Sequence, residues 1–184
     1  MLRLTSSLWT PVSLGTDGRL ARVRAVITSW DTVARDNASL TVRAKEFDLP
    51  EALQHVEQPL RVLVDSHNKA DTSAPFFQAA GEVNHVCAQK GEDKVNLLKL
   101  LERLAGNNIN EVLVEAGATL SGAFVKAGLF DELIVYMAPK LMGATALPLF
   151  NLAYNSMDEA LPFHIDSVET IGRDIKIRYL PERE

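Results

Sequence analysis

LVEAGATLSGAF, residues 113–124, joins an apolar run to a glycine-containing turn and then to a segment with helical spacing. Short, near-continuous apolar runs are typical of strands that are covered on both faces in an α/β sheet. Glu115 ends the run, and Gly117 allows a tight turn because it has no Cβ. The stretch therefore predicts a strand that leads directly into a helix, which is a building unit of α/β domains.

The turn in this stretch has two interpretations. The backbone amides of Ala118, Thr119 and Leu120 would lie at a helix N-terminus, where they lack intrahelical partners and favour a bound phosphate. The hydroxyls of Thr119 and Ser121 would add donors, and Gly122 would let a ligand or a strand approach closely. Alternatively, the glycines serve only the packing of an ordinary strand-to-helix connection. The spacing alone leaves both interpretations open.

The rest of the chain alternates apolar runs with helical patterns. Short runs rich in β-branched residues predict five strands, at residues 24–29, 60–66, 83–88, 110–115 and 132–138. Between the third and fourth runs, residues 93–108 predict a helix that ends near Gly106, with Val95, Leu98, Leu101 and Ala105 at helical spacing. Residues 118–127 predict a second helix, which ends at Gly128.

The C-terminal segment has a different pattern. Residues 163–180 predict two strands around a turn at Gly172-Arg173-Asp174, because apolar and charged side chains alternate after it. We therefore expect an α/β domain with three layers, whose mostly parallel sheet ends in an antiparallel hairpin. The longest irregular stretches, residues 44–58 and 140–162, are where active-site loops are expected.

Composition narrows the function classes. The chain has 184 residues, enough for one domain with a sizeable core, and 47% of them are hydrophobic. A net charge of −5 gives no general footprint for nucleic acid, and no apolar run is long enough to span a membrane. We read no export signal at the N-terminus, and the single Cys87 suits a reducing cytoplasm. The four histidines are scattered, so we expect no metal site.

Polar side chains follow two more of the predicted strands. Thr32, Asp36 and Arg43 come after residues 24–29, and Asp65 and Ser66 end the run at 60–66. Ligands of open α/β sheets bind at the carboxyl ends of strands, so these residues are candidates for a binding site. The alternative is that they form surface turns and cap loop backbone. His85, within an apolar run, is expected to be a hydrogen-bonded interior or edge histidine.

Four segments together resemble a known family: TVARDNASLTVR, RVLVDS, VEAGATLSGAF and AGLFDELIVYMAPKLMG. They are similar, in the same order, to the reductase domain of the riboflavin-biosynthesis deaminase/reductase, which has a dihydrofolate-reductase-like fold. The likeness runs from about residue 24 to residue 150. It implies an NADPH-dependent reduction of 5-amino-6-(5-phosphoribosylamino)uracil, in which the ribosyl group becomes a ribityl chain.

The resemblance also implies roles for individual residues. It places the cofactor against Thr32, Asp36, Ser66, Gly117, Ala118, Thr119, Leu120, Ser121, Gly122 and Ala123. It places the substrate against Leu40, Arg43 and Glu115, with Arg43 on the sugar phosphate. Hydride must reach an opened ribosylamine, and a proton must be supplied. Asp36 or Glu115 would steady the cationic imine or relay the proton, and the sequence does not decide between them.

The resemblance has departures near the N-terminus. The family's first strand continues as Ser-Leu-Asp-Gly, whereas here TSSL leads straight into WTPVSLGTDGRLARVRAV, and the region of about residues 8–25 is shortened. Asn37 and Ala38 stand where Asp-Pro is common. We expect a single reductase domain over residues 1–184, without a deaminase domain, that binds a small phosphorylated pyrimidine and forms a homodimer as its relatives do; whether a separate deaminase is a partner stays open. Two alternatives stay open, namely a related reductase with another carbonyl or imine substrate, and a catalytically weak NADP-binding subunit.

Overall fold

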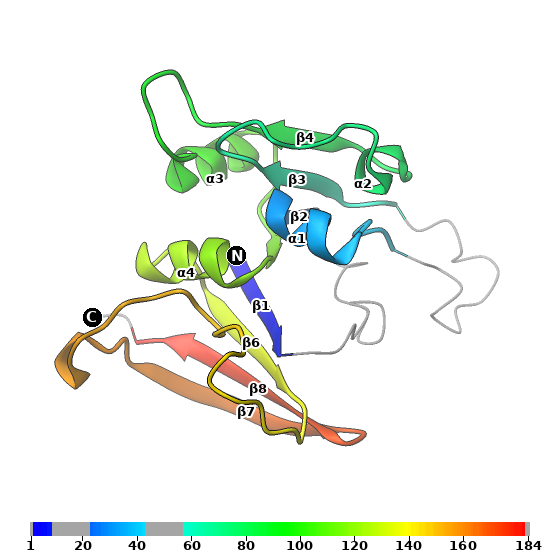
Figure 1. Ribbon diagram of the computed structural model, residues 1–184. Helices are drawn as coiled ribbons and strands as arrows, with labels where there is room; N and C mark the ends of the chain where they lie inside the picture. Colours follow the sequence, from blue (N-terminus) through cyan, green and yellow to red (C-terminus); the bar gives the residue numbers. More distant parts are fainter. Residues whose placement is uncertain (1, 9–22, 43–56, 183–184) are drawn as a thin grey trace. The chain divides into compact units, whose positions relative to one another are not determined.

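The computed structural model describes residues 2–8, 23–42 and 57–182, the first of these by backbone alone. The chain divides into two compact units, residues 11–113 and residues 1–10 with 114–184. Their elements, most of which are labelled in Figure 1, are β1 (Leu2–Leu8), β2 (Ala25–Ser29), α1 (Trp30–Asp36), β3 (Leu60–Val64), α2 (Pro75–Gln78), β4 (Val83–Val86), α3 (Leu97–Gly106), β5 (Val112–Glu115), α4 (Ala118–Lys126), β6 (Glu132–Met137), η3 (Met157–Glu159), β7 (Phe163–Ile171) and β8 (Asp174–Pro181). Most of the predicted loop at 44–58 and of the shortened region at 8–25 lies outside the described residues. Among the described helices, none has the length and hydropathy that crossing a lipid bilayer requires.

In the unit of residues 11–113, three parallel strands lie in the order β4-β3-β2. Ser29 at the end of β2 is in register with Val64 at the end of β3. One core cluster joins Val33 of α1 to Leu63 and Phe76, and a second contains Val23, Val26, Val42 and Leu113. Leu40 packs against both clusters, so the segment that follows α1 is tied to the core of this unit.

The helix α1 was not among the elements predicted from the sequence, which gave only candidate polar residues and surface turns after β2. The Ser29 side chain caps it by accepting a hydrogen bond from the Thr32 amide at 3.4 Å. The helix buries Val33 and ends at Asn37, whose φ of 49° is left-handed. A single buried side chain gives too little periodicity to reveal so short a helix in the sequence.

The helix α3 confirms the predicted element and corrects its buried face. Asn96 accepts a hydrogen bond from the Lys99 amide at 3.0 Å, so the helix begins at Leu97 rather than near residue 93. Its buried side chains are Leu100 and Leu104, not the stripe predicted through Val95, Leu98, Leu101 and Ala105. Leucines occupy two adjacent faces of this helix, and spacing alone cannot say which face meets the sheet.

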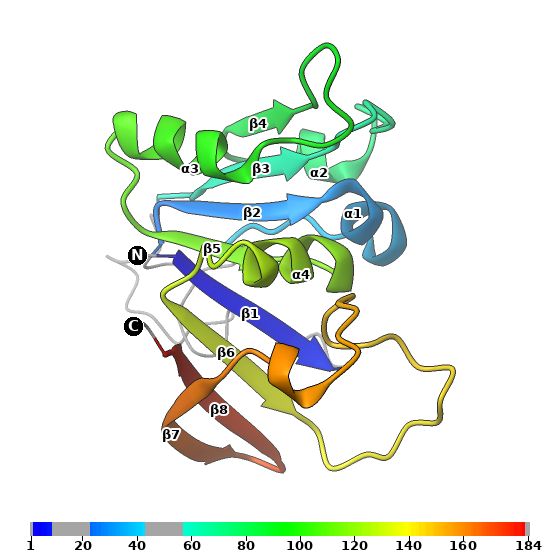
Figure 2. The same cartoon turned by 90° about the vertical axis from the view of Figure 1, so that its left-hand side faces the viewer.

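In the other unit, four strands lie in the order β1-β6-β8-β7 (Figure 2). The strands β1 and β6 are parallel, whereas β8 is antiparallel to both β6 and β7. The turn between β7 and β8 contains Gly172 with a φ of 62°, as the hairpin prediction requires. The predicted α/β class, mostly parallel with an antiparallel C-terminal hairpin, is confirmed. The apolar-run criterion missed β1, because polar residues interrupt LRLTSSL.

The long irregular segment of residues 140–162 packs against the helix α4. The Asn151 amide donates a hydrogen bond to the Ala118 carbonyl oxygen at 3.0 Å. A Cβ on Gly122 would lie only 3.2 Å from the backbone nitrogen of Asn151. The close approach that Gly122 was predicted to allow is therefore made by the chain itself. It fixes the middle of the irregular segment beside the first turns of α4.

Candidate active site

The turn between β5 and α4 has the backbone geometry that the sequence predicted. Residues Val112–Val114 are buried, and Glu115 is partly buried where the strand ends. Gly117 occupies the N-cap position of α4, and no side chain of the described residues caps that helix end. The amides of Ala118 and Thr119 are in the first helical turn, and the Thr119 side chain is exposed. First-turn amides without a side-chain cap can donate hydrogen bonds to a bound anion.

One of the predicted cofactor residues in this turn, Ser121, donates its hydrogen bonds locally. The buried Ser121 donates a hydrogen bond from Oγ to the Ala116 carbonyl oxygen at 2.9 Å. Its amide donates to the Gly117 carbonyl oxygen at 3.2 Å, which closes the first turn of the helix. Leu120 is buried, whereas Ala123 is exposed. Ser121 therefore stiffens the turn, and the surface of the segment is formed by Gly117, Thr119 and Ala123.

A second candidate segment, residues 65–70, wraps around the buried carboxylate of Asp65. This carboxylate accepts hydrogen bonds from the Ala70 amide at 2.8 Å and from His85 Nε2 at 3.0 Å. Burial alone raises the pKa of the carboxyl group, but hydrogen bonds from the amides of Lys69 and Ala70 and from the imidazole outweigh it and lower the pKa. The ionised group thus organises the loop, and His85 on the edge strand β4 is hydrogen-bonded as predicted.

Ser66, in the same loop, accepts a hydrogen bond at Oγ from the Val95 amide at 3.2 Å. Its carbonyl oxygen accepts a bond from the Ala88 amide at 3.3 Å. The capping interpretation of Asp65 and Ser66 is therefore confirmed. It does not exclude ligand binding by Ser66, because a hydroxyl that accepts one hydrogen bond still has its own hydrogen to donate.

Cys87 lies beside this loop without the geometry of a nucleophile. Its Sγ is 3.6 Å from His85 Nε2, the same nitrogen that bonds to Asp65. In a nucleophile–base–carboxylate relay, the two partners contact different ring nitrogens. Burial and the Asp65 carboxylate also raise the pKa of the thiol, which disfavours the reactive thiolate.

The third candidate segment follows β2. Thr32 Oγ1 is 2.9 Å from Ser29 Oγ at the start of α1, and Asp36 is exposed at the last position of that helix. Leu40 is partly buried and has a φ of 50°. Arg43, the predicted phosphate ligand, lies outside the described residues. Because β2 and β3 are parallel neighbours, Thr32 and Ser66 follow strand ends at the same edge of the sheet.

Sequence reasoning missed two side chains that shape this unit. Arg61, the second residue of the otherwise apolar strand β3, is fully buried. Its guanidinium donates hydrogen bonds to the backbone carbonyl oxygens of Ser39 (3.1 Å), Phe76, Ala79 (2.8 Å) and Gly81 (3.0 Å). Gln58 is bonded twice to the backbone of Val42. The only signal in the sequence was the presence of an arginine within the run LRVLV.

Known proteins place the chain in a family. Residues 15–177 match the RibD C-terminal domain. The chain belongs to the RibD C-terminal domain family. The riboflavin biosynthesis protein RibD of Haemophilus influenzae is 36% identical over 183 residues, which cover 88% of this chain and 49% of that protein. RibD of Escherichia coli is 34% identical over 84% of this chain and 48% of its own length.

Not all relatives of this RibD C-terminal domain are longer proteins. A 5-amino-6-(5-phosphoribosylamino)uracil reductase of Buchnera aphidicola is 30% identical over 187 residues, which cover 89% of both chains. The solved structure of Acinetobacter baumannii RibD (form 2) matches 98% of this chain and 57% of that one, with a TM-score of 0.85 and 29% identity. The predicted dihydrofolate-reductase-like fold is thereby confirmed. The chain spans about half the length of the RibD proteins that it matches.

Proposed function

We propose that the chain reduces 5-amino-6-(5-phosphoribosylamino)uracil to its ribitylamino product with NADPH, as a step in riboflavin biosynthesis. The main support is the similarity, over 89% of both chains, to the Buchnera reductase whose name states this substrate. The four motifs of the family lie in the family's order along this chain. A deaminase, on this polypeptide or on another, is the expected source of the substrate.

The residues at two of the candidate segments fit a dinucleotide phosphate. The first turn of α4 offers backbone amides without a side-chain cap among the described residues, and the exposed Thr119 adds a hydroxyl. In the other unit, Ser66 keeps a hydroxyl hydrogen to donate. We assign Thr32, Asp36, Ser66 and residues 117–123 to cofactor binding. The bound nicotinamide would supply the hydride.

The protein would supply binding and the proton. We assign Leu40, Arg43 and Glu115 to the substrate, with the Arg43 guanidinium on the sugar phosphate, where a bidentate contact is favourable. Asp36 and Glu115 are the two carboxylates proposed to steady the cationic imine or to relay the proton. Glu115 is partly buried and Asp36 is exposed, which favours Glu115 because charge interactions are stronger away from water.

The absorbance of NADPH tests this function directly. We expect the wild-type chain to oxidise NADPH when the deaminated ribosylamino substrate is present and not when it is absent. Arg43→Ala should raise KM about tenfold or more, since a charged hydrogen bond is lost, and leave the Kd of NADPH nearly unchanged. NADPH binding without turnover would contradict the proposal and leave the two alternatives, another substrate or a catalytically weak subunit. Loss of NADPH binding in Arg43→Ala would overturn the assignment of Arg43.

We further propose that the protein forms a homodimer through one face of the sheet β6-β8-β7. The strand register places Met137, Ile165, Val168 and Ile175 on this face, because directly opposed residues in antiparallel strands share a face. A bulge between Ile165 and Ser167 keeps Ile165 on the same side as Val168. The exposed fractions of these four side chains are between 36% and 59%. We call this set the apolar hairpin face.

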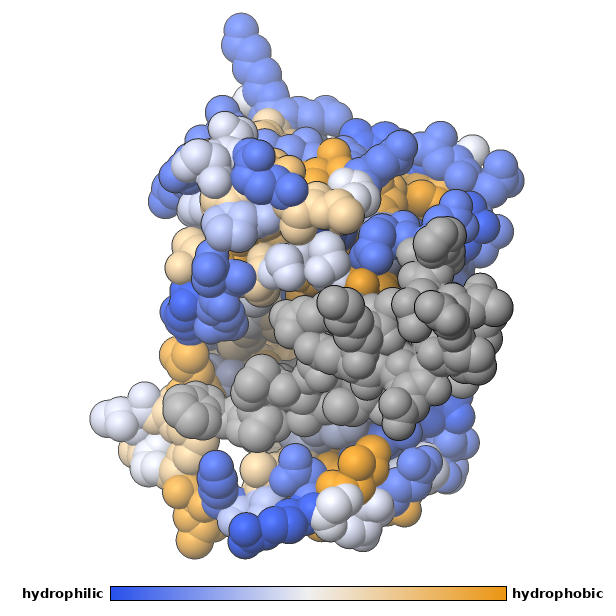
Figure 3. Space-filling model, turned by 90° about the vertical axis from the view of Figure 1, so that its right-hand side faces the viewer, coloured by the Kyte–Doolittle hydropathy of each residue, from blue (hydrophilic) through white to orange (hydrophobic). Residues whose placement is uncertain are grey.

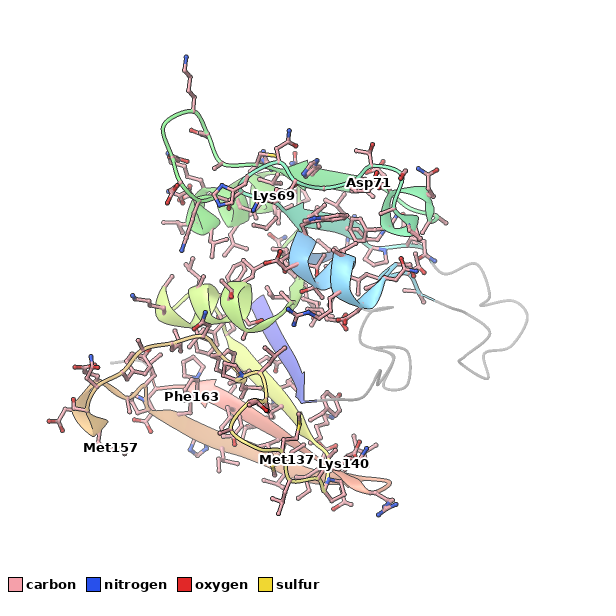
Figure 4. The ribbon with its side chains drawn as sticks, viewed as in Figure 1. Lys69, Asp71, Met137, Lys140, Met157 and Phe163 are labelled. Carbon is pink, nitrogen blue, oxygen red and sulfur yellow. The ribbon has the colours of Figure 1, made fainter. Side chains whose placement is uncertain are left out.

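The apolar hairpin face continues beyond the strands. A cavity of about 280 Å³ at one end is lined mostly by apolar residues and also by Lys140 and Arg173; the apolar ones are Met137, Ala138, Pro139, Leu141 and Ile175. Figure 4 shows Met137 and Lys140 together near the hairpin turn, and Figure 3 shows hydrophobic surface (orange) among polar residues at the lower end, in this unit. Contiguous apolar surface of this kind marks an interaction site. An isologous pair, in which the same face meets itself, would bury it.

Val168→Glu should convert the dimer to monomers, because each isologous pair would bury two new carboxylates in an apolar contact. Light scattering after size-exclusion chromatography would measure the mass at several concentrations. Leu98→Glu is the matched control, since Leu98 is similarly exposed but belongs to α3 in the other unit. A monomeric wild-type chain, or dissociation caused by Leu98→Glu alone, would contradict the proposed interface.

A further inference from the structure

Leu40 has a backbone conformation that its side chain does not favour. Its φ of 50° lies in the left-handed region, which leucine rarely adopts. Such residues cost on the order of 1–3 kcal/mol and persist only when the surroundings fix them. Leu40 is also one of the two described residues, with Glu115, that the proposed function assigns to the substrate. Its conformation therefore raises the question of what holds it.

Side chains from elsewhere bind the backbone on both sides of Leu40. On one side, Arg61 donates a hydrogen bond to the Ser39 carbonyl oxygen at 3.1 Å. On the other, Gln58 Oε1 accepts a bond from the Val42 amide at 2.8 Å, and Gln58 Nε2 donates to the Val42 carbonyl oxygen at 3.0 Å. One glutamine thus satisfies both backbone groups of Val42, as a neighbouring strand residue would.

Gln58 is itself held in place. It precedes β3, where the Leu60 amide donates to the Arg24 carbonyl oxygen at 3.0 Å. The Gln58 side chain packs against Gly81, at which a Cβ would lie 2.8 Å from Gln58 Cβ. Gly81 also has a φ of 97°, so two reasons favour glycine there. These contacts hold the backbone and the Cβ of Gln58 in place, so its side-chain amide group is positioned to bind Val42.

We infer that Gln58 is a positioning residue for the substrate. By binding both backbone groups of Val42, it holds Leu40 in its left-handed conformation. The inference rests on the proposed function, because that function places Leu40 on the substrate. Gln58 acts through the backbone, and the cofactor residues Thr32 and Ser66 do not depend on its two bonds. Its loss is therefore expected to affect substrate binding selectively.

Gln58→Leu keeps a side chain of similar size and removes both hydrogen bonds. We expect the KM for the substrate to rise about tenfold, while kcat and the Kd of NADPH change less than about twofold. A merely structural role would lower the melting temperature without this separation of KM from kcat. The matched control is Gln78→Leu, since the exposed Gln78 also bonds to a backbone carbonyl, that of Thr72, at 3.2 Å. It should leave KM unchanged.

Amide hydrogen exchange at Val42 provides a readout that does not need activity. Gln58→Leu should accelerate exchange of this amide at least tenfold in the folded protein, and Gln78→Leu should not. If the wild-type chain shows no turnover, the proposed function fails, and calorimetric binding of the substrate then replaces KM. Weaker binding by Gln58→Leu would still support the inference. Unchanged KM or affinity, unchanged exchange, or no substrate binding by the wild-type chain would overturn it.

Discussion

Arg61→Leu is expected to lower the free energy of unfolding by about 4 kcal/mol, since removing a buried charged donor leaves its partners unsatisfied. Four carbonyl oxygens, one from Ser39 and three from the stretch 76–81, share this one guanidinium. The Phe76 ring also lies 5.0 Å from Arg61 Cζ, which adds a cation–π contact. Urea denaturation would measure this loss of unfolding free energy as a lower midpoint at an unchanged m-value.

The expected effect is large because no other side chain can make the same hydrogen bonds as the Arg61 guanidinium. Burial lowers the pKa of its guanidinium, which reports the cost of keeping the charge away from water. Arg61→Lys should recover only part of the stability, because an ammonium group is a point donor and cannot span the same carbonyls as a planar fork. Arg103→Leu, on the exposed side of α3, is the control and should change stability by less than about 0.5 kcal/mol. A loss below about 1 kcal/mol for Arg61→Leu would contradict its structural role.

Local sequence patterns were sufficient to predict many of the strands and helices of this fold. The runs that became β2, β3, β5 and β6 are apolar because most of their side chains are buried. The hairpin β7-β8 could be predicted since Gly172 and the alternation of Ile175 and Ile177 with charged residues are local signals. The start of α4 followed from Gly117 alone. Elements of this kind depend on neighbours in the sequence.

Other features depend on residues far apart in the chain, and the sequence did not reveal them. Nothing near Arg61 indicates that carbonyls from residues 39, 76, 79 and 81 would surround it. The left-handed conformation of Leu40 likewise depends on Gln58, eighteen positions away. In α3, the choice between two leucine-bearing faces is made by the sheet. Tertiary contacts decide each of these cases.

In the candidate site, too, some features could be predicted from the sequence and others depend on tertiary contacts. The family motifs located Thr32, Ser66 and Glu115, but not which of their groups are already engaged. The Asp65 carboxylate binds its own loop, and the Ser121 hydroxyl binds the Ala116 carbonyl oxygen. A motif thus mixes residues that hold the backbone with residues that face a ligand. Only the described contacts separate these two kinds.

The choice between the two candidate carboxylates gives the largest expected effect on catalysis. Glu115→Gln should lower kcat by about 10²–10⁴-fold, which is the usual contribution of a group that transfers a proton. The Kd of NADPH should stay within about twofold, because the substitution changes no first-turn amide of α4. Asp36→Asn should lower kcat less than about tenfold, since Asp36 is exposed and its charge is screened by water and salt.

Rapid-mixing measurement of a single turnover would separate the chemical step from product release in both variants. Glu111→Gln is the matched control, because Glu111 is also partly buried and lies just before β5, at the opposite end from Glu115. It should leave kcat within about twofold of the wild-type value. A larger loss in Asp36→Asn than in Glu115→Gln would reverse the assignment. Equal, small losses would mean that neither carboxylate transfers the proton, so that water would have to supply it.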